Sequence, residues 1–430
     1  MVYLRTLSSK YAGPVNIALI MHELLVEGGG ERQCVSLARE LIRQGHQVVL
    51  YTSAYDAPNC FPQICKDIKV VDVGRGRLPW LRNPRVLRGY LDMSWLASAV
   101  GTAHQIWHPH HWPAQWGAVW LKRKLGGAVA WMCNDVPNFH QLAHQPASFG
   151  SLLRAPIYWL DYLYDRSQNR KVDLTLFLSQ WAESEFRVVY PGATQVVRSG
   201  ADPDRFKPGA DREKIRGRFG YRPDDFVLLW LGIVMPHRRL QDAINAVGHL
   251  KVRGTKVKLL LAGSERGFPD YFNQLQTLVG ELGLEQEVTF AGKVANEEMR
   301  DFFCACDAFL FPNENQTWGL AVMEAMACGC PVLVSEGAAV HEVLTDNESA
   351  VLFPPRRPDA LADKIQMLID QPQLRQRIAE RGRELTRTKY NWEQFANQIS
   401  QIFQQLIEQG KQQRSLSAPA DSEPVRAPRN

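Results

Sequence analysis

The sequence predicts an α/β protein made of two domains, each built around a parallel β-sheet. At 430 residues the chain is longer than most single domains, so two domains are expected. From Phe226 onward, short and continuous apolar runs alternate with helical stretches. Such runs are typical of strands buried on both faces of a parallel sheet. Near the start, a strand, a glycine-rich loop, a helix and a second strand follow one another, as they do at the start of a Rossmann-like domain.

The first of these units begins with the apolar strand Asn16–Met21. The loop Glu27–Glu31 holds three adjacent glycines and leads into a helix that Gly45 ends. The loop is not a dinucleotide fingerprint, because G-x-G-x-x-G is absent, and it is not a P-loop, because no G-K-[ST] follows. Its position after the first strand favours close approach of the backbone to a ligand over a merely flexible loop. Further strands of this half are expected at Val48–Thr52, Val70–Val73, Ala128–Met132, Leu174–Ser179 and Gln195–Val197.

A region rich in arginine and tryptophan occupies residues 75–120. Arg82, Arg85 and Arg88 lie around a helix start predicted at Asn83-Pro84. Such a helix could rest on an anionic membrane surface. A solvated arginine edge over a tryptophan-containing core is the slightly favoured alternative. Nucleic acid is not expected as a partner, because the basic residues are confined to this region and the net charge is only +5.

Two polar clusters of the first half allow a metal site but favour simpler interpretations. His108, His110 and His111 have no carboxylate or cysteine beside them, so a polar pocket lining is favoured over a zinc site. The triplet Asp202-Pro203-Asp204 could hold a cation. The turn-forming residues around it favour a linker turn between the two halves.

The second half alternates strands and helices. Strands are expected at Phe226–Gly232, Val257–Gly263, Val288–Gly292, Ala308–Pro312 and Pro331–Ser335. Helices are expected at Leu240–Val252, Tyr271–Leu282, Asn296–Cys304, Gly319–Cys328, Asp359–Asp370, Gln373–Leu385 and Trp392–Gln409. The tail Lys411–Asn430 is rich in Ser, Pro and charge, and is expected to be disordered.

The composition excludes several classes of protein. The longest apolar run, Phe226–Met235, is far shorter than the ~18 residues of a membrane-spanning helix. The first eleven residues lack the apolar segment of a signal peptide. The eight cysteines form no C-x-x-C pair, so they are interpreted as reduced, buried thiols of a cytosolic protein rather than as a zinc site.

The stretch Asn313–Ser335 is the strongest candidate for a ligand site. It predicts a polar loop, a short helix ended by Gly329, and a buried strand. The loop follows another strand, so the helix begins where ligands bind in parallel sheets, and its N-terminus favours phosphate. Glu324 lies at the edge of the apolar face of this helix. Its carboxylate could pair with a nearby arginine or accept hydrogen bonds from ligand hydroxyls, and the helical pattern does not decide between the two.

The order and spacing of several segments resemble the family-4 retaining glycosyltransferases of the GT-B fold. These segments are GGGERQCVSLARELIRQGHQV, SGADPDRF, LGIVMPHRR, LLLAGS, VTFAGKV and QTWGLAVMEAMACGCPVLVSEGAAVHEVL. The resemblance covers roughly residues 16–409 and implies two Rossmann-like domains facing across a cleft. We therefore expect an acceptor-side domain over 1–205, a nucleotide-sugar-binding domain over 206–390, a C-terminal helix over 391–410 that packs back on the first domain, and a tail over 411–430.

The resemblance also assigns roles to residues of this chain. Glu324 matches the second glutamate of the family's E-x7-E signature, which implies a contact to the donor ribose. The first glutamate is replaced by Gln316, which cannot carry a negative charge. Ile233 replaces a basic residue, and Asn134 stands where the family often has a histidine. The implied catalytic residues are Arg238, Gln316 and Glu324. The implied donor-binding residues are Gly29, Gly30, Arg239, Lys293, Thr317, Trp318, Gly319 and Leu320. The implied acceptor-side residues are His110 and Asn134.

The function implied by the resemblance is transfer of a sugar from a UDP- or GDP-linked donor to a glycan, lipid-linked or small-molecule acceptor, with retention. A place in cell-envelope or exopolysaccharide synthesis is expected. No cofactor and no metal are expected. The expected location is cytoplasmic, with peripheral contact at the inner face of the membrane. The three substitutions leave a non-catalytic binder of nucleotide sugars as the alternative. A nicotinamide oxidoreductase is disfavoured, because the dinucleotide fingerprint is missing.

Overall fold

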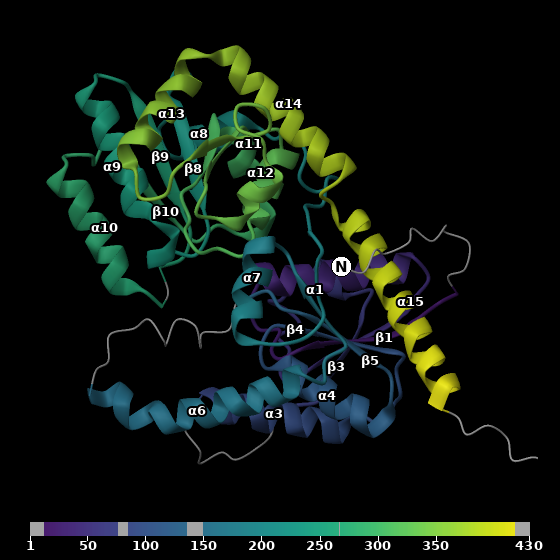
Figure 1. Ribbon diagram of the computed structural model, residues 1–430. Coiled ribbons are helices and arrows are strands. Elements are labelled where there is room, and N and C mark those ends of the chain that lie inside the picture. The colour runs from purple at the N-terminus through teal and green to yellow at the C-terminus, as the bar shows by residue number, and fades with distance from the viewer. Residues whose placement is uncertain (1–12, 76–84, 136–148, 266, 418–430) are drawn as a thin grey trace, which may run out of the picture.

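The computed structural model describes residues 13–75, 85–135, 149–265 and 267–417. Within these residues, a parallel seven-stranded sheet forms the centre of the first half of the protein (Figure 1). Its strand order is β3-β2-β1-β4-β5-β6-β7. The strands are β1 (Asn16–Met21), β2 (Gln47–Thr52), β3 (Lys69–Asp72), β4 (Ile106–His110), β5 (Ala128–Met132), β6 (Leu174–Phe177) and β7 (Thr194–Val196). The helices are α1 (Gly29–Arg43), α2 (Pro62–Cys65), α3 (Arg85–Ala99), α4 (Ala114–Leu125), α6 (Phe149–Asn169) and α7 (Gln180–Val189).

A six-stranded parallel sheet with the order β10-β9-β8-β11-β12-β13 forms the second half among the described residues. Its strands are β8 (Phe226–Leu231), β9 (Val257–Ala262), β10 (Val288–Gly292), β11 (Ala308–Phe311), β12 (Val332–Ser335) and β13 (Val351–Phe353). The helices are α8 (Arg212–Arg218), α9 (Leu240–Val252), α10 (Pro269–Glu281), α11 (Met299–Ala305), α12 (Leu320–Ala327), α13 (Pro358–Asp370) and α14 (Pro372–Thr388). The 3₁₀ turns are η1 (Pro236–Arg238), η2 (Asn296–Glu298) and η3 (Ala339–Val343). Two parallel-sheet α/β domains are therefore confirmed.

The last helix, α15 (Trp392–Ser417), leaves the second domain and runs along the first, where it packs on α1 and β5 (Figure 1). Its buried face includes Phe395, Ile399 and Phe403. The helix continues to Ser417, although the sequence predicted disorder from Lys411. Lys, Gln and Arg follow Gly410, and these residues are good helix formers that extend the helix. Residues 418–430 lie outside the described part of the chain.

The polypeptide passes between the domains twice, near Ala201 and near Tyr390, and these two connecting segments lie against each other. The backbone N–H of Ala201 donates to the carbonyl oxygen of Tyr390 at 3.1 Å. A Cβ on Gly200 would collide with the same carbonyl, so only glycine permits this approach. Asp202 accepts hydrogen bonds from the backbone N–H groups of Asp204 and Arg205, which confirms the linker-turn interpretation of the Asp-Pro-Asp triplet.

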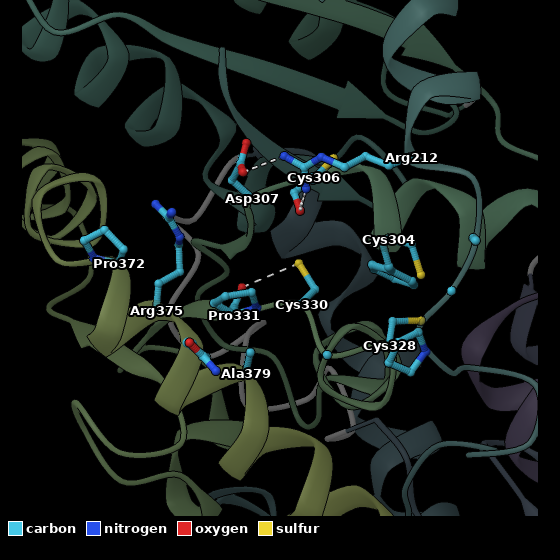
Figure 2. A pocket seen from close by; sticks show the side chains of 16 residues that line it. Arg212, Cys304, Cys306, Asp307, Cys328, Cys330, Pro331, Pro372, Arg375 and Ala379 are labelled. Carbon is cyan, nitrogen blue, oxygen red and sulfur yellow. Dashed lines mark hydrogen bonds and ion pairs between the residues drawn. The ribbon is translucent and has the colours of Figure 1, made fainter. Parts of the chain in front are cut away.

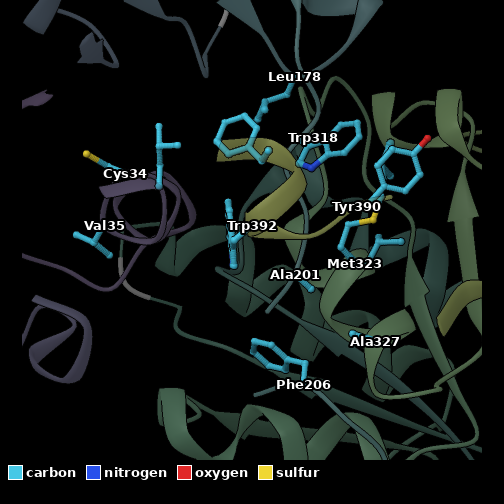
Figure 3. Close-up of a cluster of buried hydrophobic side chains, with 14 of the residues drawn as sticks. Cys34, Val35, Leu178, Ala201, Phe206, Trp318, Met323, Ala327, Tyr390 and Trp392 are labelled. Carbon is cyan, nitrogen blue, oxygen red and sulfur yellow. The ribbon is translucent and has the colours of Figure 1, made fainter. Parts of the chain in front are cut away.

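One apolar cluster joins the two domains (Figure 3). It contains Cys34 and Val35 of α1, Trp318 and Met323 around α12, and Trp392 at the start of α15. The cluster therefore receives side chains from the first domain, the second domain and the final helix. Burial of apolar surface is the main stabilising term in such a core, so this cluster stabilises the arrangement of the two domains.

The arginine- and tryptophan-rich region has both buried and exposed side chains where it is described. Trp107 and Trp116 are fully buried, whereas Arg75 and Arg88 each pair with Glu23. Trp95 of α3 is half-exposed and its Nε1 donates to the carbonyl of Val73 at 2.9 Å. Arg77, Trp80, Arg82 and the helix start predicted at Asn83-Pro84 lie outside the described residues, and so does the side chain of Arg85.

Candidate functional site

The carboxyl ends of strands from the two sheets meet at one place. Asn134 follows β5 of the first domain, and Thr317 follows β11 of the second. The Thr317 hydroxyl donates to the backbone carbonyl of Asn134 at 2.7 Å. Ligands of parallel sheets bind at this edge. The contact therefore brings a predicted donor-side residue and a predicted acceptor-side residue into one site between the domains.

The glycine loop lies between the start of α12 and His111. A Cβ on Gly29 would lie 3.6 Å from Cδ1 of Leu320, which is an ordinary contact. A Cβ on Gly30 would collide with the His111 ring, so this position requires glycine. The loop, His111 and Leu320 thus form one wall of the site.

Glu31 is a site residue that the sequence did not single out. It lies in the first turn of α1, where the helix dipole favours a negative charge. Burial raises its pKa, and a hydrogen bond from its own backbone N–H and the charge of His111 partly oppose this rise. The glycine loop was expected to approach a ligand closely, and the Glu31 carboxylate lies against Gly28, so a phosphate bound at this loop would meet Glu31.

His111 and Asp135 form an ion pair at the edge of the site. Their Nδ1 and Oδ2 atoms lie 3.1 Å apart. Burial works to lower the pKa of His111, but its hydrogen bond to Asp135 and the charges of Asp135 and Glu31 together outweigh burial and leave the pKa raised. The pKa of Asp135 is lowered although burial opposes this, because His111 donates to it and the positive charges of His111 and Arg238 stabilise the carboxylate. Both shifts favour the charged forms of the pair.

Arg238 is the cation that points to an anionic ligand. It ends η1, just beyond β8, and its Nε has no hydrogen-bond partner among the described residues. Burial lowers its pKa to about 10, and the charge of Asp135 opposes this shift. A desolvated guanidinium with an unused donor gains most from an anion that supplies the missing hydrogen bond.

His237 and Gln316 lie next to Arg238. Burial and the charge of Arg238 lower the pKa of His237 to about 4, so its imidazole is neutral near pH 7, while a hydrogen bond with the Gln316 side chain opposes the shift. Glu314, which could replace the missing family glutamate, instead accepts from Nε of Arg356 at 2.9 Å. Gln316 therefore faces the site without a carboxylate from Glu314 beside it.

Glu324 is buried and bound to an arginine of the other domain. Arg32 of α1 donates from one guanidinium nitrogen to Oε1 of Glu324 and from another to Asn296. The arginine partner that the helical pattern allowed is thus present. A hydroxyl of the predicted ribose would have to use the other carboxylate oxygen, Oε2, or displace Arg32.

The remaining predicted donor-side residues differ in their access to the site. Arg239 holds Asp242 with two hydrogen bonds of 2.9 Å, so its charge is already used at the start of α9. Trp318 is buried, and its Nε1 has no partner among the described residues. Gly319 is the residue that caps α12. Lys293 is exposed just beyond β10, at the carboxyl edge of the second sheet.

His110 is the last residue of β4 and is fully buried. The strand was not predicted, since Pro109 and two histidines interrupt its apolar pattern. His110 is fully buried with its ring against His108, and burial takes its pKa well below the usual value. His111, the next residue, leaves the strand with a positive φ of 60° and reaches the edge of the site. His111 is therefore the histidine of this pair that lies at the edge of the site, and the acceptor-side role expected of His110 stays a prediction.

A cluster of possible metal ligands lies beside the site, where His22, Glu23 and Asp92 bring ligand atoms together. His22 already hydrogen-bonds Asp92 at 2.9 Å, and Arg75 and Arg88 both pair with Glu23. Two guanidinium groups on one ligand oppose a bound cation. We therefore interpret this cluster as an ion-pair network.

Family models cover both halves of the chain. The model of the glycosyl transferases group 1 matches residues 211–385, and the model of glycosyltransferase family 4 matches residues 27–205. The protein belongs to this family of glycosyltransferases. The resemblance stated from the sequence segments is thereby confirmed, and the protein is a glycosyltransferase of the GT-B type.

Relatives of this glycosyltransferase are similar to it over most of its length. An alpha-D-kanosaminyltransferase of Streptomyces kanamyceticus is 24% identical over 80% of this chain and 93% of its own. A D-inositol 3-phosphate glycosyltransferase of Corynebacterium glutamicum is 24% identical over 88% of this chain and 92% of its own. The similarity therefore extends over both domains in each case.

Solved structures share the two-domain fold. HepE of Anabaena, crystallised with UDP, superposes with a TM-score of 0.71 at 18% identity and covers 91% of this chain and 100% of its own. The sucrose-phosphate synthase of Thermosynechococcus elongatus superposes with a TM-score of 0.72 at 22% identity and covers 91% of this chain and 99% of its own. In the described part of this glycosyltransferase, none of the helices is both long and apolar enough to cross a membrane.

Proposed function

We propose that the protein transfers a sugar from a UDP- or GDP-linked donor to a glycan, lipid-linked or small-molecule acceptor, with retention of anomeric configuration. The observation that carries this proposal is the meeting of Arg238, the start of α12 and the glycine loop at the facing edges of two sheets. Arg238 has an unused donor, and helix N-termini attract phosphate. The structural relative HepE was crystallised with UDP-glucose, which supports the same class of donor here.

The proposed reaction depends on stabilising the diphosphate as its bond to the sugar breaks. Negative charge grows on the leaving diphosphate, and fixed donors lower the barrier by stabilising that charge. Arg238 and the backbone N–H groups at Thr317–Leu320 would supply these donors, while Glu324 would accept from the ribose through Oε2. Gln316 would contact the transferred sugar. We propose that no metal is needed, because these groups carry the charge stabilisation.

The acceptor would enter between His111 and Asn134. The Asn134 side-chain oxygen has no partner among the described residues, so it can accept from an acceptor hydroxyl. Asp135 is held by His111, which makes it a poor nucleophile for a double displacement. We therefore propose a retaining transfer in which the acceptor attacks from the face that the diphosphate leaves.

Binding and turnover of nucleotide sugars test the proposal. UDP-, GDP- and ADP-linked sugars should be screened for a rise in the unfolding temperature, and the best donor assayed for nucleotide release with candidate acceptors. Arg238→Ala should lose most of the thermal shift. Arg239→Ala is the matched control, because Asp242 already holds that side chain, and it should keep most of it. Absence of a shift with every donor would overturn the proposal, whereas a shift without turnover would favour a non-catalytic binder.

We further propose that the protein works in the cytoplasm in cell-envelope or exopolysaccharide synthesis and touches the membrane through α3 and α6. The two helices lie side by side (Figure 1), and the Tyr90 and Tyr164 rings are in contact at 5.7 Å. Exposed apolar side chains gather on these helices. They are Leu87, Tyr90, Trp95, Trp159, Leu160 and Leu163. Such a surface can enter the headgroup region of a bilayer.

Vesicle binding tests the membrane contact. Leu160→Glu should reduce co-sedimentation with vesicles that contain anionic lipid, because a charge opposes insertion of the surface. Val252→Glu is the control, since Val252 is more exposed than Leu160 but lies at the end of α9 in the other domain. Equal binding by both variants and the unchanged protein would contradict this contact.

A further inference from the structure

A pocket lies at the C-terminal end of α12, the opposite end of this helix from the candidate site. Its volume is about 570 Å³, and it opens at the amino ends of β11 and β12, next to the linker residues Pro208–Ala210. Four cysteines line it, as Figure 2 shows. They are Cys304, Cys306, Cys328 and Cys330. All four thiols are free, and the proposed glycosyl transfer does not use them.

Two of these thiols form a pair. Cys304 belongs to α11, and Cys328 is the residue that caps the C-terminus of α12. Their side chains interact and lie next to each other beside the linker (Figure 2), and the Cys304 thiol also donates to the carbonyl oxygen of Lys207 at 3.7 Å. Cys330 instead donates to the carbonyl of Pro331 at 3.6 Å. The pocket therefore brings together one close pair from two separate helices.

The two members of the pair differ in reactivity. Cys304 is half-buried, whereas Cys328, Cys306 and Cys330 are buried. The hydrogen bond from Cys328 lowers the pKa of Cys304 to about 6, with further help from the backbone of Ala210 and the charge of Arg300, while burial opposes the shift. Arg300 is fixed by donating from Nε to the carbonyl of Lys207 at 2.8 Å. A thiolate is the nucleophilic form of cysteine, so Cys304 is the thiol that reacts first.

A shared metal ion does not explain the cluster. Among the described residues, no three of these sulfurs lie within 4.8 Å of one another, the spacing that common coordination would require. A pair of neighbouring thiols, one nucleophilic and one beside it, is the arrangement of a cysteine that reacts with oxidants and a second that resolves the product.

We propose that Cys304 and Cys328 form a reversible oxidation site in which a peroxide converts the dithiol into a disulfide. The Cys304 sulfur attacks one peroxide oxygen, which breaks the O–O bond, forms a sulfenic acid and releases one water. The Cys328 sulfur then attacks the sulfenic sulfur and expels its oxygen as a second water. Two thiols lose two electrons and two hydrogens, and hydrogen peroxide gains them. A small thiol reductant reverses the reaction by thiol–disulfide exchange.

Mass spectrometry of the full chain tests the proposed bond. Cleavage after glutamate separates residues 299–314, with Cys304 and Cys306, from residues 325–336, with Cys328 and Cys330. After hydrogen peroxide, the Cys306→Ser/Cys330→Ser variant should yield these two fragments as one disulfide-linked species that a reductant separates. The Cys304→Ser/Cys328→Ser variant is the matched control and should yield none. Linkage absent from the first variant, or equal in both, would overturn the proposal.

The relative rates at which the cysteines of the unchanged protein are alkylated give a second test, and this comparison requires no variant. At neutral pH, iodoacetamide should label Cys304 about tenfold faster than Cys306, because only Cys304 is mainly thiolate. In Cys328→Ser, peroxide should leave a sulfenic acid on Cys304 that dimedone traps. Equal labelling of Cys304 and Cys306 would contradict the role of Cys304 as the attacking thiol.

Discussion

Charge in the candidate site comes from a few groups whose protonation the neighbours control. Arg238 stays a cation, His237 is kept neutral beside it, and His111 is charged through Asp135. Glu31 adds a carboxylate whose pKa burial raises. A diphosphate at the glycine loop would therefore meet one permanent cation, one cation that titrates and one carboxylate. The affinity for such a ligand must depend on pH.

The titration of His111 predicts the direction of this dependence. Its pKa lies above the usual 6.5, so it is charged below that raised pKa and loses its charge as pH rises through it. The KM for the nucleotide sugar should increase by about fivefold over this rise in pH. A charged imidazolium that donates a hydrogen bond contributes about 1 kcal/mol more to binding than a neutral imidazole does. The measurement is donor KM against pH for the unchanged protein and for His111→Gln.

His111→Gln should flatten the upper part of this profile, because glutamine can still donate but does not titrate. Glu31→Gln is the control for the lower part, where deprotonation of Glu31 adds a negative charge. A profile that stays equally steep in His111→Gln would show that another group causes the change.

Gln316 is the residue at which this chain departs most clearly from the family pattern. Gln316→Glu should leave kcat/KM unchanged or raise it, because the carboxylate can still accept a hydrogen bond from His237 and matches the family residue. Gln316→Ala should lower kcat/KM, since it removes the side chain that is proposed to contact the sugar. Nucleotide release measures both. A complete loss of activity in Gln316→Glu would mean that the site has diverged from the family in more than this residue.

Among the elements, α1 and α12 are joined across the domain boundary by Arg32 and Glu324. Both side chains are buried, and Arg32 also donates to Asn296 of the second domain. Glu324 therefore has two candidate tasks, fixing α1 against α12 and accepting from the donor. A single substitution would disturb both tasks, so their separation needs two variants.

Glu324→Ala should destabilise the protein by about 3–5 kcal/mol, because it leaves the Arg32 guanidinium buried without its partner. It should also weaken donor binding severely. The double variant Arg32→Leu/Glu324→Leu removes both charges, so it should recover most of the stability without recovering donor binding. Chemical unfolding and the donor thermal shift measure the two effects. Recovery of both properties would mean that Glu324 acts only through Arg32.

The elements also show which parts of the fold the sequence could predict. β11, α12 and β12 were predicted within one or two residues, because Gly329 adopts a positive φ of 73° and the strands are uninterrupted apolar runs. β4 was missed, because Pro109 and the buried histidines hide a central strand. The contacts of Glu31, His111 and Arg32 were missed for another reason. They join segments far apart in the chain, and no local pattern reports such pairs.

At the scale of the whole molecule, the order of the helices and strands along the sequence differs from the way they are grouped into domains. Helix α15 comes last in the sequence but contributes its buried face to the first domain. The backbone contact between Ala201 and Tyr390 brings the two domain connections together at the same boundary. The polypeptide therefore adds the last helix of the first domain only after it has formed the second domain. The stability of the first domain should consequently depend on side chains near the C-terminus.

Phe403 of α15 offers the sharpest test of this dependence. It is fully buried, and its ring lies 5.1 Å from that of His108 in β4. Phe403→Ala should destabilise the first domain by about 3–5 kcal/mol, the usual cost of removing a buried aromatic side chain. Gln401→Ala, on the exposed face of the same helix, should change stability little. Denaturant unfolding followed by circular dichroism measures both variants. If α15 were merely an appendage of the second domain, Phe403→Ala would behave like its control, because the core around β4 would be complete without that ring.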